Sequence, residues 1–115
     1  MAQVNPNDVA TAAIQVLQAA IDRLSALKLK HGADIAGIDA QIGKLQDKQD
    51  DFRVQALRTI EDSDANKQAI AAMNDAAANL KTEAATIKDA ATLLTGVAQV
   101  LSAAAALLAA LAPFL

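Results

Sequence analysis

The sequence predicts an all-α protein, an antiparallel helical bundle or coiled coil of three helices whose last helix is long and apolar. Alanine supplies 30 of the 115 residues, tyrosine and tryptophan are absent, and there are only two phenylalanines. This composition is typical of long helices rather than sheets. Apolar residues recur at alternating spacings of three and four, and no stretch alternates with period two for long enough to predict a strand. We expect one helical domain at this length.

The first helix is expected over residues 6–31. Asn5 suits the N-cap, Pro6 suits the first helical position, and Asp8 lies near the positive end of the helix dipole. One apolar helical face follows, made of Ala10, Ile14, Leu17, Ile21 and Leu24. Positive groups in the last turn and Gly32 then predict the end of this helix.

The second helix is expected over residues 34–61, with Asp34 as its cap. Its apolar seam comprises Ile35, Ile38, Ile42, Leu45, Gln49, Phe52 and Ala56. Gln49 is the one polar member. We interpret it as facing solvent at the edge of the bundle rather than setting the helix register from a buried position. The many charges on the opposite side indicate a solvated face.

The third helix is expected as one continuous element over residues 64–112, after a turn that Asp62 or Ser63 caps and before Pro113. Two heptad series run through it. One series reads Ile70, Ala77, Ala84, Ala91, Ala98, Ala105 and Ala112, and the other reads Met73, Leu80, Ile87, Leu94, Leu101, Leu108 and Leu115. A column of small residues beside a column of large ones favours close helix packing.

Residues 90–115 form a segment without any charged residue. A second apolar stripe appears there, made of Leu93, Val97, Val100, Ala104, Leu107, Leu111 and Phe114. A helix that is apolar on nearly every side must be buried on every side. Two helices of the expected lengths would cover only the first half of the third, which leaves this segment bare. The alternative is a break near Gly96, which would give a compact four-helix bundle.

The residues most strongly implicated in function therefore belong to this charge-free segment. They are expected to form a self-association or membrane-inserting helix and are Ala91, Leu94, Ala98, Leu101, Ala105, Leu108, Ala112, Val97, Val100, Leu107, Leu111 and Phe114. Twenty apolar residues suffice to span a bilayer as a helix. The alanine content makes insertion only weakly favourable. We therefore expect conditional insertion into a membrane, with oligomerisation into a pore as a further step.

Two other functions use the same residues. The Ala and Leu columns would also pack the subunits of a soluble filament or closed oligomer. A compact bundle acting as an adaptor is the second alternative. A homo-oligomer and a lipid bilayer are the expected partners.

Enzyme activity, cofactors and metal sites are not expected. The chain has no cysteine, and His31, its one histidine, is interpreted as a cation at a helix C-terminus. No residue pattern predicts a small-molecule substrate. The net charge of −3, without a basic patch or stacking aromatic residues, argues against nucleic acid.

The N-terminus does not predict a secretory signal. It lacks a basic first segment, and Gln15 and Gln18 interrupt its first apolar stretch. We expect a cytoplasmic protein or one exported by a route without such a signal, in either case with possible membrane association.

Overall fold

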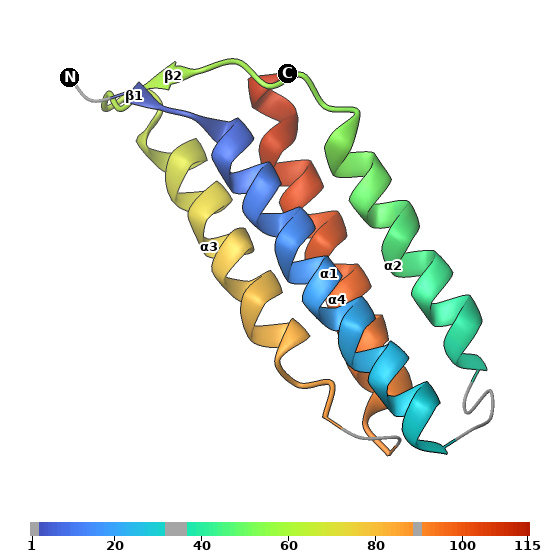
Figure 1. Cartoon of the computed structure of the whole chain (residues 1–115). Coiled ribbons are helices and arrows are strands. Elements are labelled where there is room, and N and C mark those ends of the chain that lie inside the picture. Colours follow the sequence, from blue (N-terminus) through green and yellow to red (C-terminus); the bar gives the residue numbers. More distant parts are fainter. Residues whose placement is uncertain (1–2, 32–36, 89–90) are drawn as a thin grey trace.

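In a computed structural model of the chain, residues 3–31, 37–88 and 91–115 are described, and they form four α-helices. These helices are α1 (Pro6–His31), α2 (Ile38–Arg53), α3 (Lys67–Ala84) and α4 (Leu93–Leu111), and the 3-10 helix η2 (Ala112–Phe114) extends α4 (Figure 1). The all-α prediction is confirmed. The expected count of three helices is wrong, and the four-helix alternative is the observed arrangement.

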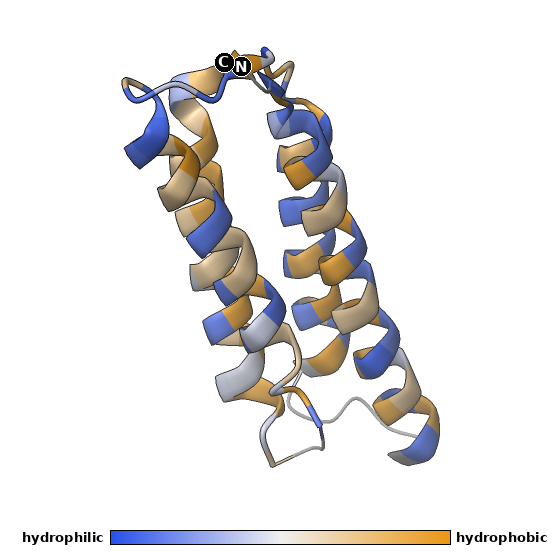
Figure 2. Ribbon diagram, turned by 90° about the vertical axis from the view of Figure 1, so that its left-hand side faces the viewer, coloured by the Kyte–Doolittle hydropathy of each residue, from blue (hydrophilic) through white to orange (hydrophobic). Residues whose placement is uncertain are grey.

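The four helices form an elongated bundle of 53 × 22 × 17 Å. Helices that follow one another in the chain run antiparallel, and both chain ends lie at the same end of the bundle (Figures 1 and 2). Around the bundle α1 packs beside α2 and α3, and α4 packs beside the same two helices. Thus α1 and α4 occupy opposite corners, and so do α2 and α3.

The segment from residue 54 to 66 crosses one end of the bundle from α2 to the opposite corner, where α3 begins (Figure 1). Within it β2 (Ile60–Glu61) pairs antiparallel with β1 (Gln3–Val4), two short strands that the sequence did not predict. The Asn7 side chain donates to the Leu57 carbonyl at 2.7 Å. Arg58 donates from its backbone to Phe114 and from its side chain to Pro113. This segment therefore ties the start of α1 to the end of α4.

The predicted start of α1 is confirmed at its cap. The Asn5 side-chain oxygen accepts a hydrogen bond from the Asn7 backbone N–H at 3.0 Å, as an N-cap residue does. The expected face is largely in the core, where Leu17 and Leu24 are fully buried. Gly32, the predicted stop, lies outside the described residues.

The second helix is shorter than predicted at both ends. It begins at Ile38, after Gly37, whose positive φ of 65° suits a residue without a side chain. The predicted cap, Asp34, lies outside the described residues. The helix ends at Arg53 rather than at residue 61, because the chain must leave the helix axis to cross the bundle end.

The turn predicted before the third helix is present, but its cap is not the one expected. Helix α3 begins at Lys67, so Asp62 and Ser63 precede it by several residues. Asn66 occupies the N-cap position without a side-chain cap hydrogen bond, and its amide instead donates to the Glu61 carbonyl at 2.9 Å.

The long third helix is the main prediction that the structure contradicts. The helix stops at Ala84, and α4 begins at Leu93. Two threonines hold the ends: the Thr86 hydroxyl donates to the Glu83 carbonyl at 2.7 Å, and the Thr92 hydroxyl accepts from the Lys88 N–H at 3.3 Å. Such hydroxyl bonds compete with helical backbone bonds. The break therefore precedes the position near Gly96 that the alternative assigned to it.

Gln49 is also placed differently from the prediction. It is 2% exposed, and its side-chain NH₂ donates to the Ile14 carbonyl and to the Gln18 side-chain oxygen, both at 3.1 Å. A buried amide needs such partners. Gln49 is thus a buried link between α2 and α1 rather than a solvent-facing residue.

Candidate functional site

Helix α4 has one buried face and one outward face. The buried face is the second apolar stripe of the sequence. Its members Leu93, Val97, Val100, Ala104, Leu107, Leu111 and Phe114 are all at most 2% exposed. This stripe is therefore part of the bundle core, so another molecule cannot contact it while the chain is folded.

The outward face of α4 carries the heptad columns. We call Leu94, Ala98, Leu101, Ala105, Leu108 and Ala112 the outer strip; its alanines are exposed, Leu94 is 53% exposed, and Leu101 and Leu108 are partly buried. Ala91, which precedes the helix in the same register, is exposed as well. The structure thus separates the predicted functional residues into a buried set and an outward set.

The two heptad series change sides at the break. Before it Ile70, Met73, Leu80, Ala84 and Ile87 are buried. After it the same series forms the outer strip. The register runs through the connection without interruption, but the reversal of the chain turns the second half of each series outward.

No other helix has an outward face like that of α4. Exposed charged residues lie along α1, α2 and α3, for example Asp22, Asp47 and Asp75. The described part of α4 and η2 has none, and the polar residues of its outward face are Thr95, Gln99 and Ser102. A helix that served only the core of a water-soluble bundle would carry charges on this face.

Helix α4 with η2 is also long and apolar enough to cross a bilayer. Leu93–Phe114 comprises 22 residues with a mean hydropathy of 1.9 and is the one such element in the described ranges. Core helices of soluble proteins reach similar hydropathy, but they are mostly buried. Here 39% of the most apolar window is buried, which leaves the larger part outside the core.

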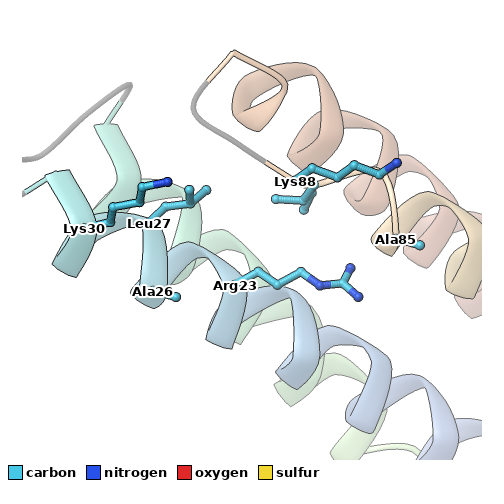
Figure 3. A pocket seen from close by; sticks show the side chains of 7 residues that line it. Arg23, Ala26, Leu27, Lys30, Ala85 and Lys88 are labelled. Atoms are coloured by element: carbon cyan, nitrogen blue, oxygen red, sulfur yellow. The ribbon is translucent and has the colours of Figure 1, made fainter.

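A second feature, absent from the sequence predictions, is a cluster of basic side chains between α1 and the chain after α3. Arg23, Lys30 and Lys88 line one cavity of about 520 Å³, with the amino groups of Lys30 and Lys88 on opposite sides of the view in Figure 3. Leu27 and Ile87 form part of its wall. The Arg23 guanidinium donates to the Ala84 carbonyl at the C-terminal end of α3, where a cation is favourable.

The basic cavity continues as a groove along α1 and α3. A second cavity, of about 440 Å³, shares Arg23 and Ala85 with the first. A third, of about 220 Å³, shares Ala12, Val16 and Lys81 with the second. We call these three cavities together the α1–α3 groove. Its described lining includes four basic residues and no acidic one.

The spacing of these basic residues is a signal that the sequence analysis missed. Arg23 and Lys30 are seven residues apart, and so are Lys81 and Lys88. Seven residues are two helical turns, so Arg23 and Lys30 lie on one side of α1, whereas Lys88 follows the end of α3 and has no helical register with Lys81. The sequence analysis expected no basic patch, whereas the fold lines one cavity with Arg23, Lys30 and Lys88 and the adjoining cavity with Arg23 and Lys81.

The described residues include no group of three or more His, Asp or Glu residues that could hold a metal ion. Comparison with protein-family models, with curated proteins and with solved structures found no match to this chain. Its function is therefore inferred from its own residues and geometry.

Proposed function

We propose that this chain is a non-enzymatic protein that associates with membranes through the outer strip of α4 and inserts α4 when the bundle opens. The observation that carries the proposal is the uncharged outward face of α4 in a molecule whose other helices carry charges there. An apolar surface of this kind is favourable against the acyl chains of a bilayer and unfavourable in water.

The length of α4 supports the insertion step. At 1.5 Å per residue, the 22 residues of Leu93–Phe114 reach about 33 Å, slightly more than the roughly 30 Å of hydrocarbon in a bilayer. Release of α4 into water would expose six large side chains of the inner stripe. Burial of each contributes about 1.5–3 kcal/mol. The hydrocarbon core replaces that burial, so insertion exchanges one apolar environment for another.

Insertion of this helix is conditional rather than permanent. Each of its nine Leu, Val or Phe residues contributes roughly −0.3 to −0.6 kcal/mol at the bilayer centre, a total of about −3 to −5 kcal/mol. The threonines, Gln99 and Ser102 reduce this total. In an inserted oligomer Ala98 and Ala105 would allow close helix contact, which is the basis for proposing a pore.

Vesicle flotation with one charged variant tests the proposal. Ala105 lies near the middle of Leu93–Phe114 and is exposed, so Ala105→Lys places a charge at the bilayer centre without burying it in the folded chain. A lysine there costs about 2.5–3.5 kcal/mol, so we expect flotation on phosphatidylcholine vesicles to fall about a hundredfold. Ala72→Lys, on the exposed face of α3, is the matched control.

Equal flotation of the two variants, or no flotation of the wild type, would reject membrane association. Dye release from the same vesicles tests the pore separately, because a helix can bind without opening one. Detection needs a label or peptide-bond absorbance, since the chain lacks tyrosine and tryptophan.

A second candidate function is soluble self-assembly through the outer strip. The observation in its favour is the regularity of the Ala and Leu columns, which contact with fluid lipid does not require. If the chain self-assembles, its molecular mass in lipid-free solution is expected to exceed the 11.8 kDa of the monomer. The Ala98→Lys variant is expected to have the mass of the monomer. A wild-type monomer at every concentration tested would reject it.

A further inference from the structure

The α1–α3 groove concentrates positive charge in an acidic protein. Its described lining includes four of the ten Lys and Arg residues of a chain whose net charge is −3. Within the described residues, neither Lys30 nor Lys88 makes an ion pair, whereas Lys48 and Arg53 do so with Asp51 and Asp50. Cations held together at a low-dielectric wall create a local positive potential. An anionic group in the cavity would lower the electrostatic energy of this cluster.

Among the described residues, Asp22 and Glu83 are acidic residues close in sequence to the lining residues, and neither lines the cavity. Asp22 accepts a hydrogen bond from Gln18 at 3.0 Å. Glu83 lines a separate cavity with Gln99 and Ser102, on the side of α3 that faces α4. Arg23 uses one N–H group on the Ala84 carbonyl, and a guanidinium has four further donors. Donors for an anion therefore remain at the end of the groove drawn in Figure 3.

The rest of the groove is mainly apolar, with Gln15 and Lys81 as polar residues in its lining. Between Ala12 and Arg23 its walls are mainly alanines, and the buried Leu107 reaches its floor. This part extends over 11 residues of α1, or about 16 Å. Small side chains on two adjacent helices leave room there for an unbranched alkyl chain. Both phenylalanines are 2% exposed, so no aromatic side chain is available to stack on nucleic acid bases.

We infer that the α1–α3 groove binds a single-chain anionic amphiphile. The phosphate or carboxylate head group lies at the basic end, whose lining includes Arg23, Lys30 and Lys88, and the alkyl chain lies along the alanine-lined part past Lys81 towards Ala12. The basic end recognises the charge, and the apolar part contributes affinity in proportion to the chain length. This site lies between α1 and α3, away from the outer strip, and the inference does not depend on the proposed function of α4.

Titration calorimetry with three probes tests the inference. Dodecyl phosphate, kept below its micelle-forming concentration, is expected to bind one per chain. Dodecyltrimethylammonium has the same chain with a positive head, and inorganic phosphate has the head without the chain; both are expected to bind at least tenfold more weakly. Equal binding of the ammonium probe would exclude the basic head-group site, and equal binding of inorganic phosphate would exclude the alkyl-chain site.

Matched variants assign the binding to the groove. The double variant Lys30→Gln/Lys88→Gln is expected to weaken dodecyl phosphate about tenfold or more, and Lys30→Arg/Lys88→Arg to retain it. Lys44→Gln/Lys67→Gln changes the net charge equally at exposed positions outside the groove and is expected to change affinity less than twofold. Equal losses in the two glutamine variants would overturn the inference, because they would show a response to net charge alone.

Two further comparisons place the alkyl chain and identify the source of the amphiphile. Ala19→Leu fills the groove and is expected to weaken the binding of dodecyl phosphate, whereas Ala71→Leu on the exposed side of α3 is expected to leave it unchanged. Equal affinities of the two variants would overturn the placement of the alkyl chain.

Ala105→Lys, which tests α4, is expected to leave the affinity for dodecyl phosphate unchanged. If Lys30→Gln/Lys88→Gln also reduces flotation on phosphatidic acid vesicles but not on phosphatidylcholine vesicles, the source is a membrane lipid; otherwise it is a free amphiphile.

Discussion

At the scale of single residues, Gly96 shows how the reversal between α3 and α4 is accommodated. A Cβ atom at this position would lie 2.7 Å from Ile87 Cγ1, which is closer than real Cβ atoms approach a neighbour. Ile87 is 1% exposed and packs where a side chain of residue 96 would otherwise be. The missing side chain therefore allows the connection to fold back onto the first turn of α4.

Replacing Gly96 with alanine is expected to lower the free energy of unfolding by about 1 kcal/mol. Alanine favours a helix by about that amount, but overpacking against Ile87 costs about 1–3 kcal/mol. Gly43→Ala is the matched control, because nothing lies within 4 Å of its added Cβ in the interior of α2. We expect this control to raise stability by up to about 1 kcal/mol in urea unfolding followed by circular dichroism. Stabilisation by both substitutions would contradict the role assigned to Gly96.

The buried Gln49 leads to a second prediction at this scale. Its side-chain NH₂ faces two oxygen atoms, the Ile14 carbonyl and the Gln18 side chain. Gln49→Glu would bring a carboxylate against two acceptors at a buried position, so we expect a loss of more than about 2 kcal/mol of stability at pH 7. The exposed Gln46→Glu on the same helix is expected to change stability by less than about 0.5 kcal/mol. A similar small effect at both positions would show that Gln49 is not buried.

At the scale of the elements, α4 combines a core face and a surface face that the sequence did not distinguish. Both faces are apolar, so periodicity alone gives two stripes of nearly equal strength. The Ala and Leu series was expected to be the packing seam, yet the equally regular stripe containing Leu107 fills the core. The reversal of the chain between α3 and α4 decides between the two stripes, because it fixes which side of α4 packs against α3 and α2.

Two lysine substitutions separate the faces of α4. Leu107 is fully buried, so Leu107→Lys is expected to destabilise the bundle by more than about 4 kcal/mol and to abolish cooperative unfolding. Ala105 is exposed, so Ala105→Lys is expected to leave the free energy of unfolding within about 0.5 kcal/mol. Thermal unfolding of the two variants in lipid-free buffer checks the assignment. Comparable stability of the two would mean that the faces are assigned incorrectly.

The same scale shows why the long third helix was predicted. Residues 85–92 contain neither glycine nor proline, and the heptads continue through them, so no local signal marks a stop. The break is held by the hydroxyl groups of Thr86 and Thr92 and by the tertiary contact of Ile87 with Gly96. The start of α1 was predictable because its cap is encoded locally by Asn5 and Pro6. Tertiary contacts of this kind leave no comparable mark in the sequence.

At the scale of the whole molecule, the two proposed binding surfaces differ in whether the sequence alone reveals them. The charge-free segment that contains the outer strip is visible in the sequence as an absence of charges. The α1–α3 groove exists only in the fold, because residues from Ala12 to Lys30 meet residues from Ala77 to Lys88 there. The first surface is therefore recognisable from the sequence, whereas the spacing of Arg23 and Lys30 alone does not show that a groove forms beside them.

The central claim is that the outer strip of α4 contacts lipid. The chain has no cysteine, so a single cysteine carrying the environment-sensitive dye NBD can be introduced at Ala105, and at Ala72 on α3 as the control. When phosphatidylcholine vesicles are added, we expect the emission at position 105 to shift to the blue and to increase, while position 72 stays unchanged. An unchanged spectrum at position 105, or equal shifts at both positions, would contradict lipid contact through α4.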